Sequence, residues 1–183
     1  MFLKIINFLT ISRILIGVII FILLAFDKNI LLAFILFLVA GLTDYFDGFL
    51  ARKYGLTSQF GEIVDPIADK ILIVFVLIGL SIHLSSYLVG FASSIIISRE
   101  IWVSALRDFN ARNNNLNATK VTFLAKLKTS VQLLTIMIYL SGLAFNKMLM
   151  IVIGDILIII SLLVTIQTGI NYTISSFKIY RKH

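Results

Sequence analysis

Acidic side chains are concentrated in one part of this chain, between Gly41 and Lys70. Five of the nine acidic residues lie there, although long apolar runs precede and follow the segment. An ionised carboxylate is costly in hydrocarbon, and those found near membrane segments usually bind an ion or a substrate. The five acids are Asp44, Asp47, Glu62, Asp65 and Asp69. The segment is therefore the first candidate for a functional site, and its chemistry would be that of carboxylate oxygens.

The four aspartates have the spacing of two helical pairs. Asp44 and Asp47 are three residues apart, and Asp65 and Asp69 are four apart, so each pair lies on one helix face. In an antiparallel hairpin that turns near Thr57, both pairs would lie ~12–20 Å from the turn at ~1.5 Å per residue. Four converging carboxylates repel one another, and one or two divalent cations would remove the repulsion. The spacing predicts a metal site.

The other possible metal ligands are few. The chain has no cysteine, and its two histidines, His83 and His183, are far apart in the sequence. A metal would therefore be held by oxygen atoms, which favours Mg²⁺ or Mn²⁺ over Zn²⁺.

The neighbours of the aspartates favour a phosphate ligand. Gly48 and Ala51 lie near the Asp44 face and leave room for a flat base or a phosphate, and Arg52 could bind a phosphate through two hydrogen bonds. Two alternatives are open. The carboxylates could pair with basic residues in a purely structural hairpin, or they could form an ion or proton pathway in a small transporter.

The composition predicts that lipid is the main solvent of these elements. Hydrophobic residues make up 60% of the 183 residues, and the mean hydropathy is +1.05, which is more than a soluble domain carries. The apolar runs are continuous and do not alternate, so helices are predicted and a barrel is not. Loop orientation and anionic lipid explain the net charge of +7, and no nucleic-acid partner is expected.

We therefore predict an all-α integral membrane protein, with a single domain over residues 1–183 and six transmembrane helices. A short interfacial helix over residues 2–9 is expected to lead into the first span. The spans are predicted at residues 10–26, 30–54, 61–84, 86–105, 119–145 and 148–172. Each is long enough to cross ~30 Å of hydrocarbon.

The basic residues predict the orientation in the membrane. Six spans place both termini and the connections after the second and fourth spans on one side, where most of the lysines and arginines lie. The opposite turns contain only Lys28 and Lys147. By the positive-inside rule the basic side is cytoplasmic. We expect a multi-pass protein of the cell membrane (the inner or cytoplasmic membrane), with its carboxylate segment facing the cytoplasm.

The carboxylate segment resembles the signature of the CDP-alcohol phosphatidyltransferases. The match holds at eight defined positions, in the pattern Asp44-x2-Asp47-Gly48-x2-Ala51-Arg52-x8-Gly61-x3-Asp65-x3-Asp69. The resemblance extends over nearly the whole chain and is strongest to the branch of the family that forms phosphatidylglycerophosphate. Segments that resemble this branch are NFLTISR (7–13), GEIVDPIADK (61–70), ISREIWVSALRDF (97–109) and AKLKTSVQ (125–132).

The resemblance implies a reaction and a role for each residue of the signature. The phosphatidyl group of CDP-diacylglycerol would pass to glycerol 3-phosphate, and CMP would leave. Another alcohol, such as inositol phosphate or serine, is the alternative within the family. A homodimer surrounded by membrane lipid is also implied. By their positions in the signature, the metal ligands for two Mg²⁺ or Mn²⁺ ions would be Asp44, Asp47, Asp65 and Asp69, the general base Asp69, and the nucleotide-binding residues Gly48, Ala51 and Arg52.

Glycerol 3-phosphate is a dianion, so its site needs cations on the same membrane face. Arg99, Arg107, Lys126 and Lys128 meet this requirement, and Arg99 stands out because it lies within an otherwise apolar span. Arg13, where the first span enters the membrane, is a further candidate for the acceptor phosphate. The alternative for Arg13 is that it extends to the lipid headgroups.

Overall fold

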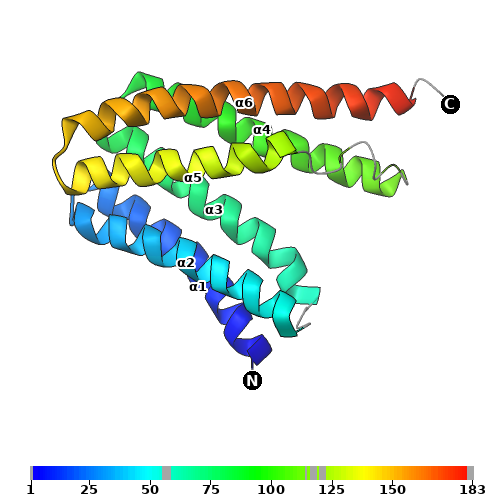
Figure 1. Cartoon of the computed structure of the whole chain (residues 1–183), viewed down its shortest axis with the longest axis horizontal. Helices are drawn as coiled ribbons and strands as arrows, with labels where there is room; N and C mark the ends of the chain where they lie inside the picture. Colours follow the sequence, from blue (N-terminus) through cyan, green and yellow to red (C-terminus); the bar gives the residue numbers. More distant parts are fainter. Residues whose placement is uncertain (1, 55–58, 114, 116–118, 120–122, 181–183) are drawn as a thin grey trace.

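The computed structural model is built of helices, and the part of the chain that it describes contains no strand (Figure 1). It describes residues 2–54, 59–113, 115, 119 and 123–180, with the side chains of all of these but 2–7, 45–54, 59, 60, 62, 63, 179 and 180. The helices are α1 (Phe2–Ala25), α2 (Ile30–Tyr54), α3 (Gln59–His83), α4 (Tyr87–Arg112), α5 (Phe123–Ala144) and α6 (Met148–Tyr180). The predicted all-α class is confirmed.

Most of these helices can span a membrane. Within the described residues, α1, α3, α4, α5 and α6 each contain an apolar stretch long enough to cross the hydrocarbon. In α2 the apolar stretch within the described residues covers Ile30–Asp44, and the side chains that follow Asp44 in this helix lie outside the described part. The helices therefore agree with the predicted membrane protein.

Three predicted boundaries are wrong. Residues 2–9 are not a separate interfacial helix but the first turns of α1, because no proline or glycine interrupts the chain before Gly17. The helices α4 and α6 end at Arg112 and Tyr180, beyond the predicted residues 105 and 172. The predicted ends mark where the apolar residues stop. A helix can continue beyond that point through polar residues until a proline, a glycine or a capping residue ends it.

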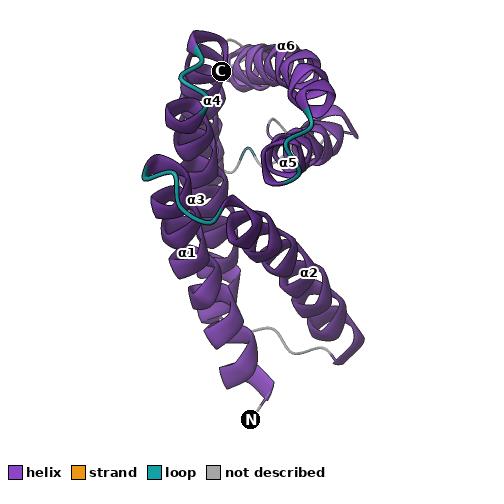
Figure 2. Cartoon of the chain, turned by 90° about the vertical axis from the view of Figure 1, so that its left-hand side faces the viewer, coloured by secondary structure: helices purple, strands orange, loops and turns teal. Residues whose placement is uncertain are grey.

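The helices pack around a ring. α1 packs against α2 and α3, α3 against α4 and more lightly against α5, α4 against α6, α6 against α5, and α5 against α2. Figure 2 shows this arrangement from the end where the short turns lie. The predicted direct packing of α2 on α3 is wrong for the described residues, because α1 packs against both helices and neither touches the other there.

Three short turns lie together at one end of the molecule. The turns α1–α2, α3–α4 and α5–α6 gather at one end, and both termini lie toward the other (Figure 1). Asp27 and Asn146 have positive φ angles of 53° and 52° in two of these turns. In each turn the next residue, Lys28 or Lys147, donates a backbone hydrogen bond five residues back, which closes the helix end.

Close contact between α1 and α3 fixes the part of the core beside the carboxylates. A Cβ at Gly17 would lie 3.1 Å from the Cα of Leu72, so the two backbones approach closely at this point. The apolar core continues from there through Ile20, Leu24 and Val76, which are all buried. This packing holds the first turns of α1, which carry polar side chains, against the start of α3.

Candidate functional site

Three helices bring polar side chains together beside the close α1–α3 contact. Thr10 and Arg13 come from α1, Asp44 from α2, and Asp65 and Asp69 from α3. The spacing of three residues in α1 and four in α3 places each pair on one helix face. We call these five residues the carboxylate cluster.

Arg13 is the centre of the carboxylate cluster. Its Nη1 atom donates to Asp44 Oδ1 and, at 2.6 Å, to Asp69 Oδ1. Its Nη2 atom lies 3.4 Å from Asp65 Oδ1, and Thr10 Oγ1 donates to that same oxygen at 2.5 Å. The oxygens of α2 and α3 thus converge on a single guanidinium that comes from α1.

The burial of Arg13 explains why it needs these partners. Its side chain is 1% exposed, whereas Asp44, Asp65 and Asp69 are 52%, 43% and 45% exposed. A buried charge is stable only when it is paired, and the carboxylates supply that pairing. Among the described side chains of the cluster, three carboxylates and one guanidinium leave an excess of two negative charges on the accessible side, which is the side from which a further cation would come.

The described carboxylates suit a metal by type but do not form a metal site in their present arrangement. In the part of the chain that the structure describes, no group of three or more acidic, histidine or cysteine side chains has the geometry to hold an ion. Arg13 Nη1 takes the position between the oxygens of Asp44 and Asp69. The donor atoms are all hard oxygens, the kind that Mg²⁺ and Mn²⁺ prefer, so the donor set fits the expected metal.

Four residues of the signature lie in α2 outside the described side chains: Asp47, Gly48, Ala51 and Arg52. Their backbone is helical, so Asp47 follows Asp44 by about one turn on the same face. Their predicted roles in metal and nucleotide binding stay predictions.

A cavity of about 220 Å³ lies next to the carboxylate cluster. Residues of α3, α4 and α5 line it, and Asp69 and Lys70 stand at its α3 side. Asp69 therefore belongs to both places, because it bonds to Arg13 and also faces the cavity. The basic residues that line the cavity are Lys70, Arg99, Arg107 and Lys128.

Polar contacts hold the basic side chains of the cavity in place. Lys128, which is only 4% exposed, donates to Glu100 Oε1. Arg99 Nη1 lies 3.3 Å from the same carboxylate oxygen. Lys70 donates to Ser104 Oγ, whose own hydroxyl donates to the backbone carbonyl of Glu100 at 2.7 Å. The carboxylate of Glu100 thus contacts two of the cations, Lys128 and Arg99, and its backbone carbonyl is linked to Lys70 through Ser104.

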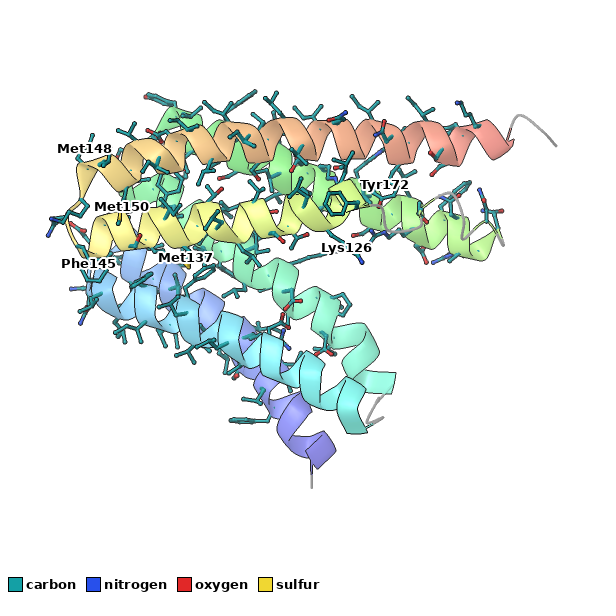
Figure 3. The ribbon with its side chains drawn as sticks, in the orientation of Figure 1. Lys126, Met137, Phe145, Met148, Met150 and Tyr172 are labelled. Atoms are coloured by element: carbon teal, nitrogen blue, oxygen red, sulfur yellow. The ribbon has the colours of Figure 1, made fainter. Side chains whose placement is uncertain are left out.

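The predicted acceptor residues divide into two groups. Arg99, Arg107 and Lys128 line the cavity. Lys126 is exposed and is not among the lining residues (Figure 3), which follows from its position two residues from Lys128 on a different face of α5. Arg13 lies in the carboxylate cluster and does not line the cavity. Its burial rejects the alternative that it extends to the headgroups.

Sequence reasoning did not assign Lys70, Ser104 or Thr10 to a site. Lys70 follows Asp69 directly, and Ser104 lies one helical turn after Glu100, so helical spacing could have indicated both. Thr10 lies one turn before Arg13. A hydroxyl one turn from an arginine occurs in ordinary helix packing as often as in a functional site, so the spacing of Thr10 did not indicate a site.

A family profile and individual relatives both connect this chain with the same group of enzymes. The profile of the family described as CDP-alcohol phosphatidyltransferase matches residues 3–167. The chain is 38% identical over 182 residues to the CDP-diacylglycerol–glycerol-3-phosphate 3-phosphatidyltransferase of Rickettsia felis, covering 97% of this chain and 95% of that protein. Proteins of the same name from Wigglesworthia glossinidia brevipalpis and Escherichia coli K12 are 46% and 36% identical over 102 and 104 residues. The matched part spans about half the length of these two relatives, 56% and 57%, and the same shares of this chain.

Proposed function

This chain belongs to the CDP-alcohol phosphatidyltransferase family, and on that premise we propose that it transfers the phosphatidyl group of CDP-diacylglycerol to sn-glycerol 3-phosphate. The products are phosphatidylglycerophosphate, a phospholipid precursor, and CMP. The main observation in support of the proposal is the position of Asp69, which belongs to the carboxylate cluster and also lines the basic cavity. The names of the relatives in Rickettsia, Wigglesworthia and Escherichia support the choice of donor and acceptor.

The carboxylate cluster supports a site for one or two divalent ions, Mg²⁺ or Mn²⁺. Asp44, Asp65 and Asp69 would hold the metal together with Asp47. When bound, the metal offsets the charge of the diphosphate and of the departing CMP. The excess negative charge around Arg13 is the observation that supports this part of the proposal.

Asp69 acts as the general base in this mechanism. Its carboxylate accepts the proton of the acceptor hydroxyl while that oxygen attacks the phosphorus that bears the diacylglycerol. The new P–O bond forms as the P–O bond to CMP breaks, and no covalent intermediate with the enzyme is needed. Since Asp69 lines the cavity, an alcohol bound there has its hydroxyl within reach of the carboxylate.

The cavity cations bind the acceptor phosphate. Arg99, Arg107 and Lys128, with Lys70 beside Asp69, give four positive charges, and the carboxylates of Glu100 and Asp69, which also line the cavity, offset two of them. A dianionic phosphate would restore the balance of charge. The cytidine diphosphate binds on the α2 side, at Gly48, Ala51 and Arg52.

The proposed site faces the cytoplasm, because most lysines and arginines fall near the termini and in the connections after α2 and α4, and both termini lie toward one end of the molecule (Figure 1). The membrane is the cell (inner or cytoplasmic) membrane, and the family resemblance supports a homodimer within it.

The test is an assay of CMP release. Purified protein in detergent receives CDP-diacylglycerol, Mg²⁺ and one of several alcohols: glycerol 3-phosphate, inositol phosphate or serine. Release that depends on glycerol 3-phosphate is the expected result, and EDTA should abolish it. Release with another alcohol would show that the protein belongs to another branch of the family. If folded protein releases no CMP with any alcohol, the proposal is refuted.

A further inference from the structure

The ring of Tyr172 lies beside both arginines of the cavity. Tyr172 is 4% exposed, and its side chain packs with Val103 and Leu106 of α4. The guanidinium carbons of Arg99 and Arg107 lie 5.8 and 5.7 Å from the centroid of the ring. In Figure 3 the ring is directed from α6 toward the start of α5. These distances are those of cation–π contacts.

Two more residues of α6 fix the path of Arg99. Thr168 Oγ1 accepts a hydrogen bond from Arg99 Nη2 at 2.9 Å, and the hydroxyl of Thr168 is itself oriented by the backbone carbonyl of Val164 at 2.9 Å. A Cβ at Gly169 would lie 3.1 Å from Arg99 Cγ. The aliphatic part of Arg99 thus passes closely over Gly169, and its guanidinium reaches Thr168 and Tyr172.

The charges of the cavity explain why such support is needed. Arg99 and Arg107 share the cavity with Lys70 and Lys128, and like charges at this distance repel when no anion is bound. Among the described residues, the carboxylate of Glu100 pairs with Arg99 and Lys128 and not with Arg107. The face of an aromatic ring attracts cations without adding a charge that would repel an anion.

We propose that Tyr172 is a positioning residue that holds Arg99 and Arg107 ready for the phosphate of the acceptor alcohol, with Thr168 fixing the direction of Arg99. The inference rests on the proposed function, because the phosphate is that of the acceptor. Tyr172 is not among the residues that line the cavity, so it would act through the two arginines. Guanidiniums that are already in place lose less freedom on binding, so the effect is on acceptor affinity. CDP-diacylglycerol binds elsewhere and is unaffected.

The experiment compares Tyr172→Leu with Tyr172→Phe in the CMP-release assay. The leucine variant loses the ring face, so its KM for glycerol 3-phosphate should rise on the order of tenfold. Its KM for CDP-diacylglycerol and its kcat should stay close to those of the wild type. The phenylalanine variant keeps the ring face, and its KM for the acceptor should stay within about twofold of the wild-type value. Thr168→Val should raise the same KM by about threefold.

Tyr139→Leu is the matched control. Tyr139 is another buried tyrosine, but it lies in α5 and donates to Asp155 at 2.7 Å, and it does not line the cavity. Its replacement should lower the Tm and leave the KM for glycerol 3-phosphate unchanged. The inference is overturned if Tyr172→Leu raises both KM values alike, or if Tyr172→Phe loses as much acceptor affinity as Tyr172→Leu.

A second measurement separates this inference from the proposed function. Stabilisation by inorganic phosphate, measured as a shift in Tm, needs no turnover. Phosphate should raise the Tm of the wild type and of Tyr172→Phe more than that of Tyr172→Leu, and equal shifts in all three would refute the positioning role. If the wild type releases no CMP, the proposed function fails and this comparison still tests Tyr172. If Tyr172→Leu does not fold, Thr168→Val takes its place in both measurements, and an unchanged acceptor KM or phosphate shift then counts against the inference.

Discussion

Replacing Arg13 by methionine tests how the carboxylate cluster is stabilised with and without a metal. The substitution keeps an unbranched stem in the buried position and removes the guanidinium on which Asp44, Asp65 and Asp69 converge. Without a divalent ion, the three carboxylates then repel one another with no cation between them. With a divalent ion bound, the metal takes over the role of the guanidinium.

The magnitude follows from two of the contacts. Hydrogen bonds to charged groups contribute about 1.5–3 kcal/mol each, and Arg13 makes two at short distance, to Asp44 and Asp69. Both carboxylates are about half exposed, and solvent screening reduces each contribution to roughly 1–1.5 kcal/mol. The loss is therefore about 2–3 kcal/mol. For a chain of this size that corresponds to a fall in Tm of about 4–12 °C in EDTA.

The assay is a thermal denaturation of the detergent-solubilised protein, with EDTA and then with saturating Mg²⁺. An ion present at 100 times its Kd stabilises the folded state by about 2.7 kcal/mol, so Mg²⁺ should return most of the lost stability to Arg13→Met. The wild type should gain less from Mg²⁺, because the metal competes there with the guanidinium. Arg112→Met is the control, since Arg112 pairs with Asp108 at 2.9 Å on the exposed surface and should change the Tm by less than about 2 °C in either buffer.

Two results would refute this reasoning. An equal fall in Tm with EDTA and with Mg²⁺ would show that the guanidinium and the metal do not occupy alternative positions. An unchanged Tm in EDTA would show that the pairing of Arg13 contributes nothing to stability.

Three further substitutions test the site and its support. Asp69→Asn should lower kcat by about 10²–10⁴-fold and retain binding of CDP-diacylglycerol in a pull-down with labelled lipid; near-normal turnover would reject the general-base role. Lys128→Met should raise the KM for glycerol 3-phosphate about tenfold or more and leave that for CDP-diacylglycerol unchanged, because Lys128 and its partner Glu100 belong to the cavity; a rise only in the KM for the lipid would contradict this. Gly17→Val should lower the Tm by several degrees, corresponding to about 1–3 kcal/mol of overpacking, because the new side chain meets the backbone of Leu72; an unaltered Tm would mean that α1 and α3 can separate freely.

The shared face of Asp65 and Asp69 was predictable because helical spacing fixes it. Residues three or four apart share a face, so Asp65 and Asp69 had to point the same way, and Asp44 reaches the same region. The helix that joins them was not predictable. In lipid nearly every helix face is apolar, so hydrophobic periodicity does not tell which helix packs on which. The assumption that neighbours in sequence pack together failed for α2 and α3.

Arg13 and Tyr172 illustrate what a sequence leaves open in a membrane protein. An arginine near the start of a span can extend to the headgroups or turn inward, and both are compatible with the same neighbours in the chain. Its 1% exposure is a tertiary fact, set by the packing of α1 against two other helices. Tyr172 lies in an apolar helix where an aromatic side chain is ordinary packing, and only the approach of α4 gives it two guanidiniums.

The position of α1 between α2 and α3 also has a consequence for the proposed metal site. Since α2 and α3 do not touch in their described parts, the separation of Asp44 from Asp69 is determined by how closely each helix packs against α1. Gly17 allows the close approach to α3 at Leu72, about one turn after Arg13. A bulkier residue there would move α3 outward and carry Asp65 and Asp69 away from Asp44. Gly17 therefore supports the arrangement of carboxylates that it does not contact.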